Sequence, residues 1–315
     1  MKLQPVIPFE PIVAEQLPVG DQWIAQIKWD GVRMLSYYDG NRSELINRRG
    51  NHRTGQYPEL ADVSTYCSAK SVILDGEVIA LKDGKPSFHE VMRRDSLKNG
   101  STIAVVRHQV PVIYMIFDIL FYNGEWTLDQ PLSSRQQLLS DIMLPHSHVQ
   151  SVPSYTNPVE LFAAAKSQNL EGIVCKDINS TYAPGGKDKR WQKRKIISDI
   201  TAVAGGFTFR DGIVNALLLG LYDDKGQLHY IGHAGPGKLT VKDKRDLTAQ
   251  AYNLAIDRMP FAAIPQRVKG AFWIKPKLVF KVHFLEWNTS GTLRQPVVQA
   301  MVDLSPEACT MEQKG

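Results

Sequence analysis

The sequence predicts an α+β fold in two domains, the first built of antiparallel sheets with flanking helices and the second a small β-barrel. Up to about residue 196, segments with the hydrophobic pattern of strands are mixed with segments that have the spacing of helices. After that point, short strands separated by Gly and Asp turns follow one another, and one helix is expected. We therefore predict domains at residues 1–196 and 197–315.

The strands of the first domain show three different patterns. Residues 23–50 (WIAQIKWDGVRMLSYYDGNRSELINRRG) predict two strands around a turn at Asp39 to Asn41, and residues 71–88 predict a hairpin that turns at Asp83 and Gly84. Residues 110–124 (VPVIYMIFDILFYNG) form a continuous apolar run, which is typical of a strand buried on both faces.

Two helices are predicted in the same domain. Residues 131–144 (PLSSRQQLLSDIML) begin with serines that we expect to act as caps, and they place Leu138, Leu139 and Ile142 at helical spacing. Residues 158–170 (PVELFAAAKSQNL) predict the second helix, and EGIVCKD follows it as a short strand.

The second domain has the pattern of an all-β module with one helix. Residues 200–235 predict three or four short strands, residues 241–256 the helix, and residues 277–287 a further strand that ends in a turn. About five strands and one helix in a segment of this length fit a small barrel such as an OB-fold.

The composition is that of a soluble globular protein, with 43% hydrophobic and 22% charged residues. The net charge of +5 is mild, but the nine residues from Lys187 to Lys195 carry six basic side chains and one acidic one. Such a run is either a nucleic-acid contact or a solvated surface. Three separated cysteines exclude a disulfide framework and disfavour a cysteine zinc site. The first residues have no long apolar core and no run reaches ~18 apolar residues, so we expect a cytosolic protein without membrane contact.

Six short segments carry chemistry when they are taken together in order. They share charged or aromatic residues at the ends of expected strands: KWDGVR (28–33), NRRGN (47–51), LDGEV (74–78), IFDIL (116–120), EGIVCK (171–176) and WQKRK (191–195). No single one is specific, because a lysine in a strand is more often surface decoration and a phenylalanine in a buried strand is more often core. All six in this order leave little room for coincidence.

The six segments resemble the motifs of ATP-dependent DNA ligases, in the covalent nucleotidyltransferase superfamily. KWDGVR looks like motif I, RRG like motif Ia, LDGEV like motif III, MIFDIL like motif IIIa, EGIVCK like motif IV and WQKRK like motif V. The later segments are similar to the OB domain of bacterial end-joining ligases. The resemblance implies an adenylation (nucleotidyltransferase) domain followed by an OB-fold domain, in the minimal two-domain form because only 27 residues precede motif I.

The resemblance implies a covalent mechanism centred on Lys28. Lys28 is expected to attack the α-phosphate of ATP and to carry AMP, which requires a neutral amine. Asp30 and Arg33 are expected to serve the phosphates and the nick, and Gly31 to free the turn. Lys193 and Lys195 are expected to neutralise the phosphate as the transition state forms. Glu171, with Asp30, is expected to bind Mg²⁺ or Mn²⁺.

The same resemblance assigns a set of residues to the nucleotide. Phe117 is expected to stack on the adenine, Glu77 to accept a hydrogen bond from the ribose, and Arg48 to contact the ribose or the incoming 5′-phosphate. The other members of the nucleotide site are Gln26, Ile27, Lys176 and Lys187.

The sequence departs from the family pattern at three places. Gln26 stands where many ligases carry Glu, and Lys187 where many carry Arg. Motif VI, a basic element that orients the pyrophosphate, is absent, since Val302 and Ser305 stand where basic residues are expected. We therefore expect slow self-adenylation, unless Arg294 supplies the missing cation.

The expected partner is nicked duplex DNA, sealed by a monomer in the bacterial cytosol or nucleoid. An RNA ligase or a capping guanylyltransferase is the alternative enzyme, because both share the lysine chemistry. A non-catalytic OB-type binding protein is the alternative from another class. The sequence leaves open whether the role is DNA repair by end joining with a Ku-type partner, another repair or recombination pathway, or backup replication.

Overall fold

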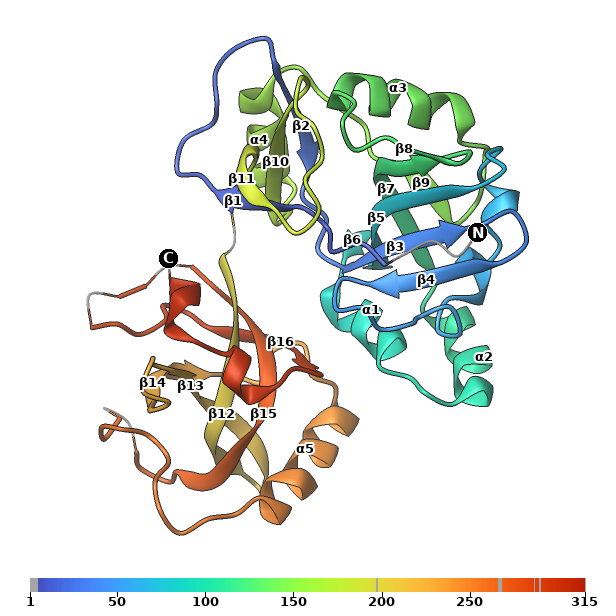
Figure 1. Ribbon diagram of the computed structural model, residues 1–315. Coiled ribbons are helices and arrows are strands. Elements are labelled where there is room, and N and C mark those ends of the chain that lie inside the picture. Colours follow the sequence, from blue (N-terminus) through green and yellow to red (C-terminus); the bar gives the residue numbers. More distant parts are fainter. Residues whose placement is uncertain (1–4, 197, 266–267, 286, 289, 315) are drawn as a thin grey trace. The chain divides into compact units, whose positions relative to one another are not determined.

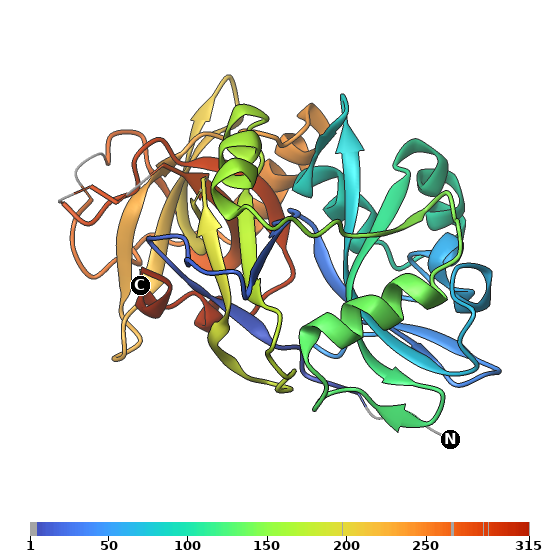
Figure 2. The same cartoon turned by 90° about the horizontal axis from the view of Figure 1, so that it is seen from above.

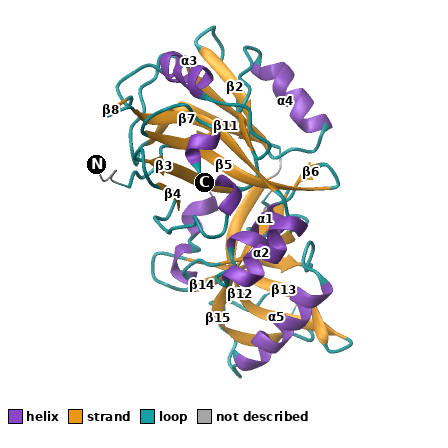
Figure 3. Ribbon diagram, turned by 90° about the vertical axis from the view of Figure 1, so that its right-hand side faces the viewer, coloured by secondary structure: helices purple, strands orange, loops and turns teal. Residues whose placement is uncertain are grey.

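The computed structural model describes residues 5–196, 198–265, 268–285, 287–288 and 290–314. The chain divides into two compact units, residues 1–196 and 197–315 (Figure 1). Each unit is built on β-sheets, and helices pack on them (Figure 3). This arrangement confirms the α+β prediction.

The larger sheet of the first unit is seven-stranded, and its central order is β4-β3-β5-β7-β8. Its strands are β3 (Val32–Tyr38), β4 (Ser43–Asn47), β5 (Val72–Lys82), β6 (Lys85–Pro86), β7 (Val112–Tyr122), β8 (Glu125–Trp126) and β9 (Val149–Ser151). The two predicted turns lie where expected, between β3 and β4 and between β5 and β6. β7 is the predicted apolar strand, and most of its side chains are buried.

The smaller sheet of the first unit has four strands in the order β1-β11-β10-β2. They are β1 (Glu10–Val13), β2 (Trp23–Ile27), β10 (Gly172–Asp177) and β11 (Lys187–Lys195). Helix α4 (Pro158–Ser167) packs on β2 and β10 (Figure 2). The apolar cluster beneath it includes Ala25, Leu161 and Ile173. One face of this sheet is therefore covered by α4.

The helices of the first unit differ from the prediction in two ways. Helix α3 (Leu132–Ile142) packs on β7, but Pro131 is its N-cap and no side chain caps it. The expected serine caps are wrong, because the helix begins at Leu132 and the serines lie inside its first turn. Helices α1 (Phe88–Asp95) and α2 (Gly100–Gln109) were not predicted, although Ser87 caps α1 by accepting from the Glu90 N–H.

The second unit is a five-stranded antiparallel sheet in the order β14-β13-β12-β15-β16. Its strands are β12 (Ser198–Arg210), β13 (Ile213–Tyr222), β14 (Leu228–Ala234), β15 (Phe272–Phe284) and β16 (Val297–Val302), and α5 (Val241–Asn253) packs on β13. Gly235 and Val297 form a parallel bridge between the ends of the two edge strands. This bridge curls the sheet towards a barrel, as the sequence predicts.

The segment that replaces motif VI is bound to the core of the second unit. Val302 and Leu304 are partly buried against that core, and Cys309 is fully buried in it. The Gln313 side chain accepts from the Thr201 N–H at 3.1 Å and donates to the Thr201 carbonyl at 3.0 Å. These residues therefore stabilise the barrel instead of presenting cations.

Candidate active site

Three neighbouring strands of the smaller sheet bring most of the predicted catalytic residues into rows. Gln26 on β2 lies opposite Val174 on β10, which lies opposite Lys193 on β11. One step along, the Lys28 N–H donates to the Gly172 carbonyl at 2.9 Å. Gly172 in turn lies opposite Lys195. Because side chains alternate along a strand, this row places the two motif V lysines on the face that carries Lys28.

The side chain of Ile27 lies on the other face of the same sheet. It packs with Trp23 and Phe162 in the apolar cluster under α4. The strand period of two residues is the physical reason, since Gln26 and Lys28 face one way and Ile27 the other. The expectation that Ile27 belongs to the nucleotide site therefore stays a prediction, and it concerns the main chain of Ile27.

Lys28 is held by the motif IV carboxylate. Its Nζ donates to both oxygens of Glu171 at 2.6 Å, and the Glu171 side chain is 3% exposed. Glu171 is positioned by Gly172, whose φ of +153° disfavours other residues and whose added Cβ would lie 2.2 Å from the Arg194 carbonyl oxygen. The Gly172 position thus lets β10 and β11 approach closely beside Lys28.

A glycine is required at position 31 because there is no room for a side chain, not because the turn needs a flexible residue. Its φ is not positive, but an added Cβ would lie 2.2 Å from the Val78 carbonyl oxygen. The loop after Lys28 therefore packs directly on β5. The expectation that Gly31 frees the turn is corrected to close packing against the larger sheet.

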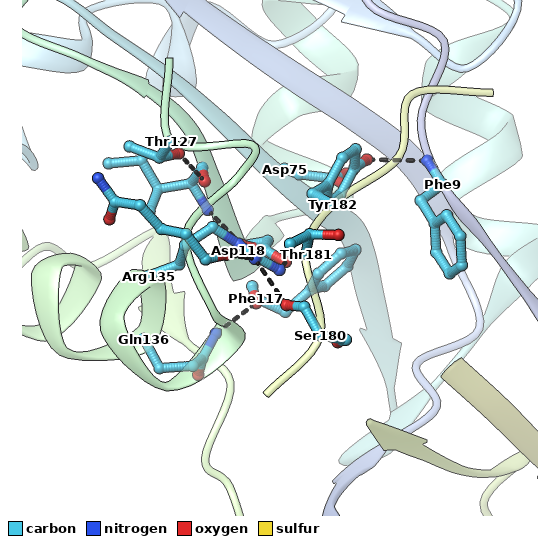
Figure 4. Close-up of polar contacts among 12 residues, drawn as sticks. Phe9, Asp75, Phe117, Asp118, Thr127, Arg135, Gln136, Ser180, Thr181 and Tyr182 are labelled. Carbon is cyan, nitrogen blue, oxygen red and sulfur yellow. Dashed lines mark hydrogen bonds and ion pairs between the residues drawn. The ribbon is translucent and has the colours of Figure 1, made fainter. Parts of the chain in front are cut away.

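Arg33 forms a buried ion pair with Asp75, a residue that was not predicted as part of the site. The guanidinium donates to both carboxylate oxygens, at 2.7 and 2.6 Å. Burial alone would lower the pKa of Arg33, but the charge of Asp75 raises it above its usual value. The Tyr182 hydroxyl also donates to Asp75, at 2.8 Å, and accepts from the Phe9 N–H (Figure 4).

An aromatic pocket with a buried amine lies beside this pair. The Lys176 Nζ is 4.3 Å from the ring centre of Phe117 and 4.0 Å from that of Trp191, and Arg33 lies over Phe117 at 4.9 Å. Burial lowers the pKa of Lys176 to about 7, and Asp118 opposes this shift. Lys176 is thus a buried amine with a lowered pKa that contacts two aromatic rings set nearly perpendicular to each other.

A second buried ion pair fixes the strand that carries Phe117. Arg135 on α3 binds Asp118 at 2.8 and 3.1 Å, and both side chains are fully buried. Gln136, the next residue on α3, donates to the Phe117 carbonyl at 2.7 Å (Figure 4). The position of Phe117 is therefore set by main-chain and side-chain bonds from α3.

Arg48 and Lys187, both predicted for the nucleotide site, lie together beside Glu10 at the start of β1. Arg48 forms an ion pair with Glu10 at the start of β1, and Lys187 lies opposite Glu10 at the first residue of β11. Lys187 is thus at the end of β11 remote from Lys195. Arg48 remains linked to motif I, because its N–H donates to the Arg33 carbonyl at 3.3 Å. Glu77 lies on β5 opposite Arg33, and Asp30 follows Lys28 on the loop.

The donor set suits a magnesium ion shared with a substrate. In the part of the chain that the structure describes, three or more His, Cys, Asp or Glu side chains do not gather in a way that could hold a metal. Mg²⁺ is commonly bound by one or two carboxylates together with phosphates and water. Glu171 already holds a cation, the Lys28 ammonium, with both of its oxygens. The Glu171 carboxylate is thus a ligand of the type that Mg²⁺ takes together with substrate phosphates.

Family models cover nearly all of both units. The model for the ATP dependent DNA ligase domain matches residues 9–195, and the model for the ATP dependent DNA ligase C terminal region matches residues 210–302. The chain belongs to the ATP-dependent DNA ligases. The two units are accordingly its adenylation domain and its C-terminal OB-fold domain.

Relatives and solved structures agree with this family. The chain is 29% identical over 299 residues to the multifunctional non-homologous end joining protein LigD of Mycolicibacterium smegmatis, covering 91% of this ligase and 37% of that protein. It is 30% identical over 283 residues to the LigD of Mycobacterium tuberculosis, covering 87% and 35%. The ligase thus spans about a third of the length of these relatives.

The structural comparison gives the same result. A structure of mycobacterial DNA ligase D complexed with ATP and MES has a TM-score of 0.72 at 26% identity, covering 97% of this ligase and 98% of that chain. The ligase domain from M. tuberculosis LigD has a TM-score of 0.51 at 25% identity, with the same coverage. Among the described residues, no helix is both long enough and apolar enough to cross a membrane.

Proposed function

We propose that this ligase uses ATP to seal nicks with a 3′-hydroxyl and a 5′-phosphate in duplex DNA. The Lys28 Nζ bonds to the α-phosphorus of ATP as pyrophosphate leaves. An oxygen of the nick 5′-phosphate then attacks the phosphorus of that AMP, and the bond to Lys28 breaks. Finally the 3′-hydroxyl attacks the 5′-phosphate and AMP leaves. The observation that supports this best is the contact of the Lys28 amine with the Glu171 carboxylate, next to the row in which Lys28, Gly172 and Lys195 pair.

The first step needs Lys28 as a free amine. In the structure its Nζ donates to Glu171, and an ammonium in such a pair has no lone pair for attack. Glu171 and Asp30 would hold Mg²⁺, which would supply positive charge that favours the neutral amine and polarises the phosphate oxygens. Lys193 and Lys195 are on the same face and stabilise charge on the α-phosphate as it becomes pentavalent.

The adenosine is proposed to lie against the aromatic pocket. Phe117 offers its ring face, and the near-neutral amine of Lys176 can donate to a ring nitrogen of the base. Gln26 lies on the same sheet face and is proposed to contact the exocyclic amine. Glu77 is proposed to accept from the ribose.

DNA contacts are proposed for the two cations beside Glu10. Arg48 is more than half exposed, and Lys187 is also exposed, so both can reach a phosphate. Because phosphate contacts release counterions, nick binding is expected to fall steeply as salt rises. Complexes held by phosphate contacts weaken by roughly 10³-fold or more between 50 and 200 mM salt. DNA binding that stays constant over this range would contradict the proposed contacts.

The missing motif VI is proposed to slow only the first step. Val302 and Leu304 are bound to the barrel core, so the segment offers no cation to pyrophosphate. Arg294 remains the proposed substitute. End joining with a Ku-type partner is one proposed role, since the matching relatives are named for non-homologous end joining.

Pre-adenylated nicked DNA tests the function without the first step. The enzyme is expected to seal this DNA faster than an unmodified nick supplied with ATP, because sealing then needs no lysyl-AMP. Replacement of Arg294 by Ala is expected to slow only the unmodified reaction. Failure to seal either DNA would contradict the proposed function, and equal rates on both would contradict the slow first step.

A further inference from the structure

Gln26, Ser154 and Gln136, which lie outside the motif segments, form a directed chain of hydrogen bonds that ends on the carbonyl of Phe117. Gln26 Nε2 donates to the Ser154 hydroxyl at 3.1 Å, and more weakly to the Val152 carbonyl at 3.5 Å. The Ser154 hydroxyl donates to Gln136 Oε1 at 3.4 Å. Gln136 Nε2 donates to the Phe117 carbonyl at 2.7 Å. The chain thus links β2 to α3 and to the strand that carries Phe117.

The direction of this chain is fixed by main-chain carbonyls at both ends. A carbonyl can only accept, so the Phe117 carbonyl selects the nitrogen of Gln136 and leaves its oxygen towards Ser154. A hydroxyl has one hydrogen, and Ser154 gives it to that oxygen. Ser154 therefore accepts from Gln26, and the Val152 carbonyl also selects the Gln26 nitrogen. A flipped Gln26 amide would set its oxygen against another acceptor.

This direction determines which atom of Gln26 faces the base. Tyr155, next to Ser154, pairs with Ala25 on the open side of β2, and β10 lies on the other side. Because Nε2 donates to Ser154, Oε1 is left to accept from another group. Among the described residues, none is seen to donate a hydrogen bond to this oxygen. Gln26 therefore offers an acceptor on the sheet face that also carries Lys176.

An acceptor at this position suits adenine and not guanine. Adenine carries an exocyclic amine donor at the place where guanine carries the O6 acceptor. The Gln26 oxygen can accept from that amine but would face the O6 of guanine unfavourably. A site built to pair with a donor group discriminates against a base that lacks it.

We propose that Ser154 and Gln136 are specificity-determining residues that select ATP over GTP by holding the Gln26 amide in one orientation. The proposal rests on the proposed nucleotide site. Glutamate at position 26 would need no such support, because a carboxylate has acceptors on both sides. The Gln26 amide carries an acceptor oxygen and a donor nitrogen, so other residues must fix its orientation to determine which of the two contacts the base.

The test compares ATP with GTP in two measurements. The first is the amount of label transferred to the protein from each α-labelled nucleotide, and the second is the ratio of the dissociation constants of the two nucleotides. Ser154→Ala and Gln136→Met are each expected to lower the preference for ATP about tenfold, the value of roughly one net hydrogen bond. The neighbours Ser151→Ala and Gln137→Met are matched controls. Neither belongs to the chain of hydrogen bonds that reaches Gln26, and Gln137 donates to Asp141 on its own helix, so neither is expected to change the preference.

A double variant separates orientation from a general structural effect. In a Gln26→Glu background, Ser154→Ala and Gln136→Met are expected to leave the ATP preference unchanged, because the carboxylate cannot be flipped. Unchanged preference in both single variants would overturn the proposal, as would an equal loss with Glu at position 26. The ratio of dissociation constants can be measured even if no covalent adduct forms. An enzyme that forms no adduct would contradict the proposed function, and the binding measurement would still test the role of Ser154 and Gln136.

Discussion

The buried amine of Lys176 makes a quantitative prediction about stability. Lysine has a pKa of ~10.4 in an unfolded chain, whereas burial lowers that of Lys176 to about 7 in the folded ligase. Between these values the unfolded chain binds a proton that the folded chain does not. The free energy of unfolding is therefore expected to rise with pH through this window. The stability gained in this way is lost as pH falls from about 10.4 to about 7.

The variant Lys176→Met removes this titration while keeping an unbranched side chain of similar size. One proton corresponds to about 1.4 kcal/mol per pH unit, so the wild type is expected to gain about 2.5 kcal/mol relative to the variant between pH 7.5 and 9.5. The measurement is urea unfolding of both proteins at several pH values, followed by circular dichroism. The slope of the difference is used, because it is independent of any constant packing change.

The control for this experiment is Lys166→Met, which removes the same charge from an exposed position on α4. Its stability difference from the wild type is expected to be flat over the same pH range. Parallel pH curves for Lys176→Met and the wild type would refute the reasoning, since they would mean that Lys176 stays protonated or is solvated in the folded chain.

Three further predictions follow from the geometry. Gly172→Ala places a Cβ 2.2 Å from the Arg194 carbonyl oxygen, so it is expected to abolish adenylation and to destabilise the fold by ~2 kcal/mol or more, measured by thermal unfolding. Gly84→Ala, at a φ of +74° but with nothing within 4 Å of the added Cβ, is expected to lose much less stability and no activity. Asp75→Asn leaves the Arg33 guanidinium buried without its ion pair and is expected to lower the unfolding free energy by ~3–5 kcal/mol; a loss below about 1 kcal/mol in urea unfolding would contradict the pairing. Nick binding, measured by fluorescence anisotropy, is expected to weaken with rising salt at a log–log slope of about −0.9 for each phosphate neutralised.

Much of the fold was predictable because local patterns and tertiary structure agree. The apolar run of β7, the Asp83-Gly84 turn and the helix α4 are each specified by their own residues. Helix α1 was missed because it carries charge and a short apolar stripe, although Ser87 followed by Glu90 is a recognisable start signal. The serine caps of α3 failed because Pro131 starts that helix instead.

The site was predictable only where its residues lie within motifs. Lys28 and Glu171 meet because the register of β2 and β10 brings motifs I and IV side by side. Both residues could be predicted because they lie in motifs that follow one another in the expected order. The partners Tyr182 and Arg135 lie outside the motifs and act through buried contacts between distant segments. A sequence shows neither which carboxylate a buried arginine will pair with nor which way an amide such as Gln26 will point. Such choices depend on hydrogen bonds that form only in the folded chain.

Label transfer from ATP tests the central claim most directly. The protein is incubated with Mg²⁺ and ATP labelled at the α-phosphate, and an acid-labile covalent adduct is sought. Lys28→Ala and Lys166→Ala serve as the test variant and the exposed lysine control. The account predicts an ATP-derived adduct in the wild type and in Lys166→Ala that is absent from Lys28→Ala. An adduct that persists in Lys28→Ala would contradict the assignment of the nucleophile.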